Sequence, residues 1–334
     1  MRSRELDILI GRLEPGTNDA ITDLGVRVGH TTVIDGTNVR TGVTVLVPPE
    51  LPLFAGCHRL NGNGELTGLE WVRESGFLTT PIGITNTFSV GVVRDAIAAE
   101  SADDDLWSLP VVGETYDGFL NDARGQHVTA EHTKSALEGA AVGAVEEGNV
   151  GGGTGMICHG FKGGIGTASR RAGDYLVGVL VQANHGRRPR FRVNGVAIGE
   201  RIADSIPTPN YDDAGSIIGI VATDAPLLPH QCDRLAQRAG LGVARMGGLG
   251  ENSSGDIFFA FTTGNRGLES DEATLNVSML PNEQLDVLFE AVVDATEESI
   301  LNALLAAETM TGRAGHTAYA LDTDLLLDAL ATRA

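Results

Sequence analysis

The stretch Glu251-Asn252-Ser253-Ser254-Gly255-Asp256 runs directly into the apolar segment Ile257-Phe258-Phe259-Ala260-Phe261. The apolar segment predicts a buried strand, and the residues before it place two hydroxyl groups at the mouth of that strand. A serine hydroxyl is a weak nucleophile unless a base takes its proton. If the peptide bond before the serine is cut, the new α-amine, with a pKa of about 7.7–8.0, can act as that base. The same residues are also typical of an ordinary turn, so both interpretations stay open.

Apolar runs and helix patterns alternate along the rest of the chain. Four more buried strands are predicted, at residues 42–47, 82–85, 175–182 and 216–222. Three helices are predicted, at residues 130–147 after the N-cap Thr129, at 227–240 ending with Gly240, and at 281–308 beginning with Pro281. Strands buried on both faces that alternate with long helices indicate a layered α/β fold. No linker divides the chain, so we expect a single domain.

Composition excludes several classes of partner. The chain has 334 residues and a net charge of −20, which argues against nucleic acid and against an anionic membrane surface. No apolar run is long enough to span a bilayer, and the first 16 residues lack the apolar core of a signal peptide. The cysteines are odd in number and far apart, which implies no disulfide framework. We therefore expect a reduced, cytoplasmic, globular protein.

The last predicted helix carries a carboxylate on its apolar face. Glu297 falls on a stripe of apolar residues that recur at helical spacing, namely Phe289, Val293, Ile300 and Leu304. A carboxylate that faces a core is costly unless it is paired or hydrogen-bonded, so Glu297 is a candidate functional acid. The alternative is that this face is only partly covered and the side chain reaches water.

Two other segments place polar side chains just beyond predicted strands. In Glu114-Thr115-Tyr116-Asp117-Gly118, the carboxylate of Glu114 could hold a substrate ammonium, and the hydroxyl of Tyr116 could donate to an oxyanion. In Gln182-Ala183-Asn184-His185-Gly186, the amide of Asn184 could serve as an oxyanion donor. Surface turns account for the same residues, so these segments alone do not settle the roles.

No cofactor motif is present. The glycine-dense runs at residues 148–155 and 162–167 lack the spacing of a phosphate-binding loop and fit close backbone packing around a cleft. Residues 61–65 form another such stretch. His127 and His132 are five apart, and neither the histidines nor the cysteines pair at zinc spacing. We expect neither a metal nor an organic cofactor.

Together these segments resemble one known family. The matching stretches follow one another in order along nearly the whole chain: residues 21–30, 61–68, 114–118, 147–155, 161–167, 181–184 and 254–257. They are similar to the L-aminopeptidase/D-alanine esterase-amidase family, peptidase family S58, which includes the bacterial β-peptidyl aminopeptidases. The resemblance implies a four-layer α/β/β/α sandwich, related to N-terminal nucleophile hydrolases but with different strand connectivity. It also implies self-cleavage and assembly into a homo-oligomer of processed αβ units.

The resemblance assigns the nucleophile to Ser254. The expected cut lies between Ser253 and Ser254 and gives chains 1–253 and 254–334. Because Asn-Ser bonds are also cut in this family, Ser253 after Asn252 is the alternative nucleophile.

The resemblance also assigns supporting roles. It implies that Glu114 binds the substrate amino group, that Tyr116 and Asn184 stabilise the oxyanion and orient the nucleophile, and that Glu297 is the acid near the nucleophile. The chain departs from some members at Ala295, where they carry a serine, and this departure removes a hydroxyl relay.

The implied activity is release of N-terminal amino acids from small peptides, amino-acid amides or esters. Two alternatives remain at this point. One is an amidase that acts on non-peptide amides, and the other is a non-catalytic family member with a binding role.

Overall fold

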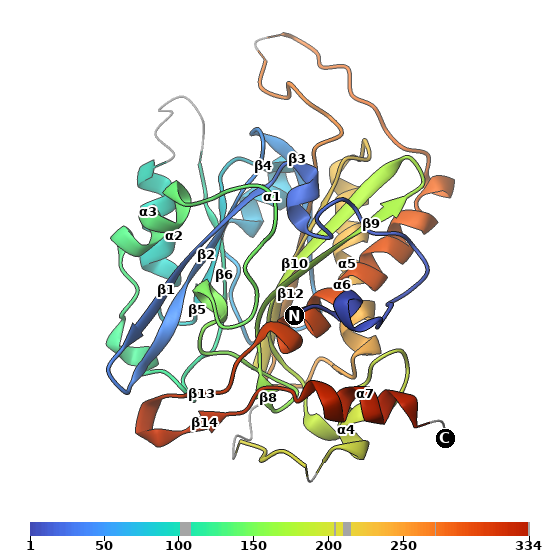
Figure 1. Ribbon diagram of the computed structural model, residues 1–334. Coiled ribbons are helices and arrows are strands. Elements are labelled where there is room, and N and C mark those ends of the chain that lie inside the picture. Colours follow the sequence, from blue (N-terminus) through green and yellow to red (C-terminus); the bar gives the residue numbers. More distant parts are fainter. Residues whose placement is uncertain (101–107, 204, 210–214, 271, 333–334) are drawn as a thin grey trace.

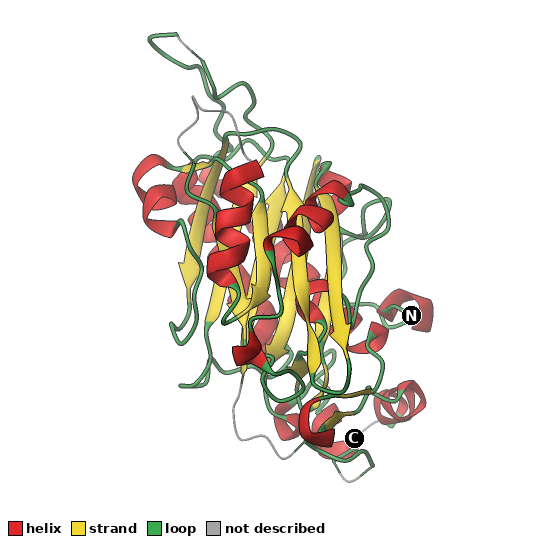
Figure 2. Cartoon of the chain, turned by 90° about the vertical axis from the view of Figure 1, so that its left-hand side faces the viewer, coloured by secondary structure: helices red, strands yellow, loops and turns green. Residues whose placement is uncertain are grey.

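Two β-sheets lie face to face, and helices cover the outer face of each (Figures 1 and 2). The computed structural model describes residues 1–100, 108–203, 205–209, 215–270 and 272–332. In the first sheet the order is β1 (Arg27–Asp35), β2 (Val39–Val47), β5 (Ile82–Asn86) and β6 (Val111–Thr115). In the second it is β4 (Phe77–Leu78), β3 (Leu53–Arg59), β12 (Asp256–Thr262), β11 (Gly215–Thr223), β10 (Tyr175–His185) and β9 (Gly164–Ala172).

The helices complete four layers. The first sheet is covered by α2 (Val90–Glu100) and α3 (Ala130–Glu138), and the second by α5 (Pro229–Arg245) and α6 (Asp286–Ala306). Shorter elements are α1 (Leu69–Ser75), α4 (Ile198–Arg201), α7 (Thr323–Ala331), β7 (Ile157–Cys158), β8 (Phe161–Lys162), β13 (Met310–Thr311) and β14 (Thr317–Ala318). The predicted α/β/β/α sandwich is confirmed. Among the described helices, none is long and apolar enough to cross a membrane.

Alternation along β12 explains its uninterrupted apolar sequence. Ile257, Phe259 and Phe261 point into the core between the two sheets. Phe258 and Ala260 point the other way, into the core beneath α5 and α6. A strand buried on both faces carries no polar alternation, which is why the sequence pattern identified it.

Strand register brings three strand ends together. In the antiparallel pair β10 and β11, Asn184 lies opposite Ser216. In the parallel pair β11 and β12, Ile217 lies opposite Asp256. The end of β10 and the starts of β11 and β12 therefore meet at one edge of the sheet.

All three predicted helices have different bounds in the structure. The helix predicted at residues 281–308 begins at Asp286 instead of Pro281 and ends at Ala306. The helix predicted at residues 130–147 stops at Glu138, because Ala141 leaves it to exchange backbone hydrogen bonds with Val28 of β1. The helix predicted to end at Gly240 continues to Arg245. Its interior glycines allow close packing instead of ending it, since a Cβ at Gly242 would lie 2.6 Å from the Thr296 Cβ of α6.

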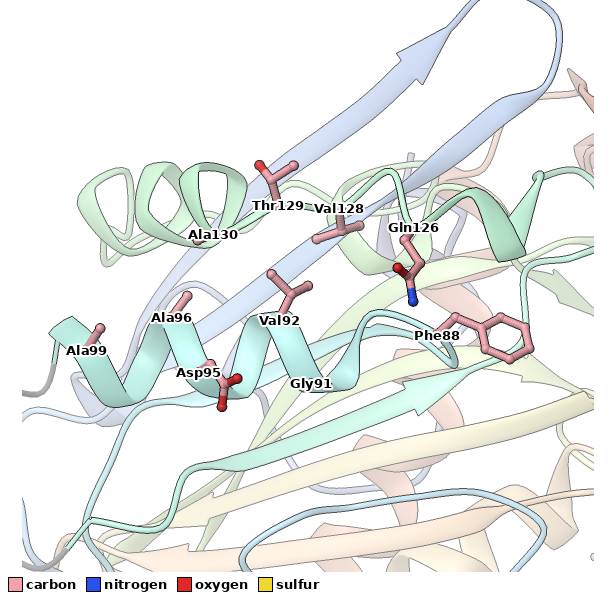
Figure 3. A pocket seen from close by; sticks show the side chains of 10 residues that line it. All are labelled: Phe88, Gly91, Val92, Asp95, Ala96, Ala99, Gln126, Val128, Thr129 and Ala130. Atoms are coloured by element: carbon pink, nitrogen blue, oxygen red, sulfur yellow. The ribbon is translucent and has the colours of Figure 1, made fainter.

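A cavity of about 650 Å³ lies on the helical layer of the first sheet (Figure 3). It is lined by α2 and the segment leading into α3, including Phe88, Val92 and Gln126. Among the described residues that line it, Asp95 is the only carboxylate, and none of the predicted site residues is among them. The candidate site therefore lies elsewhere.

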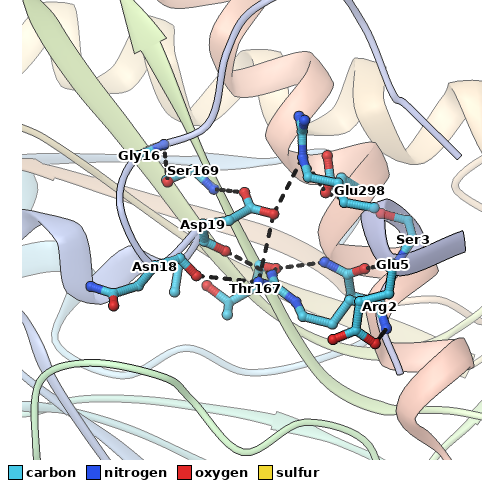
Figure 4. A network of polar contacts seen from close by, with 12 residues as sticks. Arg2, Ser3, Glu5, Gly16, Asn18, Asp19, Thr167, Ser169 and Glu298 are labelled. Carbon is cyan, nitrogen blue, oxygen red and sulfur yellow. Dashed lines mark hydrogen bonds and ion pairs between the residues drawn. The ribbon is translucent and has the colours of Figure 1, made fainter. Parts of the chain in front are cut away.

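The N-terminal segment is tied to β9 and α6 by a buried polar network (Figure 4). Arg2 donates to the Thr167 carbonyl over 2.6 Å, and the Ser3 hydroxyl donates to Glu298 over 3.0 Å. Glu298 also pairs with Arg170, and both side chains are fully buried. Strand β9 was missed in the sequence because it buries such polar groups, which the N-terminal segment satisfies.

Candidate active site

Ser254 lies at the start of β12 in a tight turn. Its backbone N–H donates to the Glu251 carbonyl over 2.8 Å. Its hydroxyl donates to Oδ1 of Asp256 over 2.5 Å. Both side chains are 1% exposed. The hydroxyl is therefore held against a carboxylate and away from solvent.

The loop at residues 61–65 holds this turn from the other side. Asn61 accepts from the Asp256 N–H over 2.6 Å and donates to the Glu251 carbonyl over 2.9 Å. Asn63 donates through Nδ2 to the Ser253 carbonyl over 2.6 Å, and through its backbone N–H to the Ser254 carbonyl over 3.3 Å. The close packing expected of this loop is present and surrounds the predicted cleavage site.

Glu114, on β6 of the first sheet, extends toward the turn at Ser254. A Cβ at Gly64 would lie 3.1 Å from both Glu114 Oε1 and the Gly255 Cα. A Cβ at this position would crowd both the carboxylate and the turn at Ser254, so Gly64 lets these two predicted site residues approach each other closely.

The carboxylate of Glu114 is buried without a cation. It accepts hydrogen bonds from the Thr87 hydroxyl and from the Glu65 N–H. Burial raises its pKa, and the hydrogen bond from Thr87 lowers it in part. Within the described residues no basic side chain pairs with it. A buried carboxylate of this kind can bind a cationic ligand.

Asn184 lies at the same edge, at the end of β10 and two strands away from β12. Its Oδ1 accepts from the Ile157 N–H over 2.7 Å, and its Nδ2 donates to the Tyr116 carbonyl over 3.0 Å. Its register partner Ser216 accepts from the Gly255 N–H over 3.0 Å. Asn184 and Ser254 are thus linked through Ser216 across three neighbouring strands.

Tyr116 is anchored at this site through its backbone. Its side chain is 36% exposed and packs over Gly118, where a Cβ would lie 2.1 Å from the tyrosine hydroxyl. The polar contact that ties it to Asn184 uses its carbonyl, not its hydroxyl.

The structure does not bring Glu297 to Ser254. Its carboxylate contacts Arg245 at 3.4 Å and the Asn194 N–H at 3.3 Å, on the helical side of the second sheet. The stripe correctly predicted a buried and paired carboxylate, since Glu297 is 2% exposed. It gave no direction toward Ser254, because α6 is buried almost all round from Ala291 to Leu305. Ala295 packs in the apolar core of that layer, so the missing hydroxyl removes no contact of Ser254.

Asp256 is the acid that lies beside Ser254, and sequence reasoning missed it. Burial raises its pKa to about 6, and the nearby Glu251 carboxylate also raises it, whereas the hydrogen bond from Ser254 lowers it. The signal was present in Ser-Gly-Asp, because residues two apart at a strand start point to the same side.

A buried lysine, Lys162, forms hydrogen bonds that hold the end of the glycine-rich run at residues 148–155 in place. Lys162 donates through Nζ to the carbonyls of Gly153, Met156 and Gly163 over 3.1, 2.9 and 2.7 Å. Burial lowers its pKa to about 7. All three donors of the ammonium are used within the protein, so the lysine supports the loop before Ile157 and is not available to a phosphate.

Cys158, His159 and His185 form a group that the sequence spacing did not predict. One ligand atom from each lies within 4.8 Å of the others, and all three side chains are buried. Burial raises the pKa of the Cys158 thiol to about 12 and lowers that of His159 to about 4. The thiol is therefore protonated and the imidazole neutral at pH 7, which is the state of packed core side chains. No role in the site follows from this group.

The four-layer fold, with a buried serine at the start of a central strand, defines a class of hydrolases related to the N-terminal nucleophile enzymes. Comparison with known proteins identifies the family. Residues 19–318 match peptidase family S58. The chain belongs to this family and is a hydrolase of the aminopeptidase type, as the sequence motifs predicted.

Relatives are similar over nearly their whole length. The chain is 47% identical to the β-peptidyl aminopeptidase BapA of Sphingosinicella microcystinivorans, over 95% of this chain and 88% of that one. Identity to a Burkholderia sp. β-aminopeptidase structure is 52%, with a TM-score of 0.94 and full coverage of both chains. The L-aminopeptidase D-Ala-esterase/amidase of Ochrobactrum anthropi, described as a variant of the Ntn hydrolase fold, gives 42% identity, a TM-score of 0.91 and 98% coverage of both.

Proposed function

We propose that the chain cuts itself between Ser253 and Ser254 and then acts as a serine aminopeptidase through the new N-terminal Ser254. Chains 1–253 and 254–334 stay associated as one unit. The substrates are small peptides, amino-acid amides or esters with a free amino group. The relatives named above are β-peptidyl aminopeptidases, a β-aminopeptidase and an L-aminopeptidase D-Ala-esterase/amidase, and this range defines the substrates to test.

The observation that carries this proposal is the position of Glu114 beside the turn at Ser254. Glu114 is a buried carboxylate with no cationic partner among the described residues, and it lies beside Gly64, which also adjoins Gly255; such a group suits a substrate ammonium. Binding that ammonium places the first amide or ester carbonyl of the substrate near Ser254. An acylated amine loses the ion pair, so the enzyme removes residues only from a free N-terminus.

Burial of Ser254 supports the need for self-cleavage. In the continuous chain its side chain is 1% exposed, and its N–H closes a turn with the Glu251 carbonyl. An external substrate cannot reach a hydroxyl buried in this way. Cutting the bond before Ser254 opens this turn and supplies an α-amine with a pKa near neutral.

In the catalytic cycle, Ser254 Oγ attacks the substrate carbonyl while the α-amine or Asp256 takes its proton. The amide of Asn184 and the hydroxyl of Tyr116 are proposed to stabilise the oxyanion, with Tyr116 moving its exposed ring to do so. Water then hydrolyses the acyl-enzyme. Neither a metal nor an organic cofactor takes part in these steps.

Two serine variants test which serine is the nucleophile and therefore which peptide bond is cut. Mass spectrometry of Ser254→Ala should show one uncut chain, and Ser253→Ala should still be cut. The opposite result would move the nucleophile to Ser253. Hydrolysis of an amino-acid anilide but not of its N-acetyl form supports the aminopeptidase over an amidase for non-peptide amides. An uncut chain that releases no amine would indicate a binding protein.

Two further expectations come from the sequence, the first from the family resemblance and the second from composition. We propose a homo-oligomer of processed units, which analytical ultracentrifugation tests. A cytoplasmic location is proposed as well, and cell fractionation tests it.

A further inference from the structure

The carbonyl of the peptide bond before Ser254 and the hydroxyl of Ser254 each have a polar side chain as partner. On one side, Asn63 Nδ2 donates to the Ser253 carbonyl over 2.6 Å. On the other, the Ser254 hydroxyl donates to Asp256 Oδ1 over 2.5 Å. The first contact polarises the carbonyl that would be attacked, and the second orients the attacking hydroxyl.

We propose that Asn63 and Asp256 are catalytic residues of self-cleavage, Asn63 as the oxyanion donor and Asp256 as the proton acceptor. This inference rests on the proposed function, because it takes Ser254 as the nucleophile. The maturation site is then distinct from the oxyanion site assigned to Asn184 and Tyr116 for external substrates.

The first step is an N-to-O shift. The Ser254 hydroxyl gives its proton to Asp256 as Oγ bonds to the Ser253 carbonyl carbon through a five-membered ring. The carbonyl electrons move onto oxygen, where Asn63 Nδ2 stabilises the charge. When the oxyanion collapses, the C–N bond breaks, and the departing nitrogen takes the proton from Asp256. An ester then joins Ser253 to Ser254 Oγ.

Water completes the reaction. It adds to the ester carbonyl, and the C–O bond breaks. The products are a carboxylate at Ser253 and a serine with a free hydroxyl and a free α-amine at Ser254. No oxidant, reductant or other co-reactant is needed.

The surrounding contacts hold both groups in place. Asn61 binds the backbone at Asp256 and at Glu251, on either side of the bond to be cut. The backbone N–H of Asn63 donates to the Ser254 carbonyl, which fixes the loop in register with the turn. Such double anchoring preorganises the donor before the reaction starts, and preorganised donors contribute most to catalysis. The pKa of Asp256, raised to about 6 by burial, leaves it ionised and basic at neutral pH.

Near-isosteric variants of the full chain test the proposal. Asn63→Asp keeps the shape of the side chain but loses the amide donors, and Asp256→Asn keeps the shape but cannot accept the proton. Asn252→Asp is the matched control, because Asn252 lies beside the cut and its side chain is exposed. The fraction of cut chain is followed by denaturing gel and intact mass after expression and during incubation at 25 °C.

We expect cleavage to slow about 100- to 1,000-fold in Asn63→Asp, as when one oxyanion donor is removed from another hydrolase. In Asp256→Asn we expect a loss of about 100- to 10,000-fold. Asn252→Asp should be cut like the unsubstituted chain. The thermal unfolding midpoint separates a catalytic from a structural role, since only a structural role lowers it along with the rate.

Different experimental results would contradict this inference and the proposed function. Cleavage of folded Asn63→Asp and Asp256→Asn within threefold of the unsubstituted rate overturns the inference and leaves Ser254 as nucleophile. The inference is also overturned if Asn63→Asp and Asp256→Asn both cut slowly and both have a lowered thermal unfolding midpoint, because the slow cleavage then has a structural cause. An unsubstituted chain that never cuts overturns the proposed function itself.

Discussion

The hydroxyl of Ser254 donates a 2.5 Å hydrogen bond to Oδ1 of Asp256, two residues further along the chain. Both side chains are buried, and the pKa of the carboxyl is raised to about 6 by that burial. The serine is therefore already paired with a proton acceptor in the continuous chain. The proposed cleavage before Ser254 therefore depends on local geometry and on the charge of the Asp256 carboxyl group.

The rate of self-cleavage should depend on pH through Asp256. The carboxyl must be ionised to accept the proton, so below its pKa of about 6 the rate should fall about tenfold per pH unit. Above about pH 7 the rate should level off, because the group is then fully ionised. Time courses of chain cutting between pH 4.5 and 8 measure this profile. A rate that is flat across pH 6 in the unsubstituted chain would rule out this carboxyl as the base.

Replacing Glu114 should weaken substrate binding more than turnover. In Glu114→Gln the ion pair with the substrate ammonium is lost, and charged hydrogen bonds contribute about 1.5–3 kcal/mol. We expect kcat/KM to fall about 10- to 100-fold, mostly through KM, in assays with an amino-acid anilide. Glu131→Gln, at an exposed carboxylate of α3, is the control and should change neither constant. An unchanged KM in Glu114→Gln would remove this residue from the binding site.

Gly64 should tolerate no side chain. In Gly64→Ala the new Cβ would lie 3.1 Å from both the carboxylate of Glu114 and the backbone of Gly255, so it forces the two apart. We expect more than a tenfold loss of activity, since small displacements at an active site are costly. Gly91→Ala is the matched control. Its Cβ meets nothing within 4 Å, and alanine stabilises a helix interior by about 0.5–1 kcal/mol. Full activity in Gly64→Ala would show that the spacing is not critical.

The ion pair between Glu298 and Arg170 should matter far more than its exposed counterpart on the same helix. Glu298→Ala leaves a buried guanidinium without its main partner, which costs about 3–5 kcal/mol. Glu290→Ala removes the pair with the exposed Arg12 and should change the stability little, because water screens an exposed ion pair. Urea unfolding of both variants measures the difference. Equal losses would mean that the network in Figure 4 does not secure the N-terminal segment.

The sequence predicted the central strands well because they are buried on both faces. Strands β5, β10, β11 and β12 therefore appear as uninterrupted apolar runs. Strand β9 was not predicted, because it buries polar side chains such as Ser169 and Arg170. Their partners come from the N-terminal segment and α6, far away along the chain, so no local pattern reveals them.

The candidate site was predicted only in part, because some of its contacts also join residues that are far apart in the sequence. The motif that contains Ser254 and the one that contains Glu114 were identified, and the fold places them together. Asn63 was seen only as part of a glycine-rich loop, because its contact with Ser253 joins residues 190 positions apart. Glu297 was chosen from a helical stripe, which carries little information on a helix buried nearly all round.

The most direct test of the central claim is a denaturing gel of the purified protein, with N-terminal sequencing of each band and an aminopeptidase assay on the same samples over time. We predict two bands, with the smaller beginning Ser-Gly-Asp-Ile-Phe, and activity that rises in step with the cut fraction. A chain that stays whole and yet hydrolyses substrate at the full rate would contradict the account.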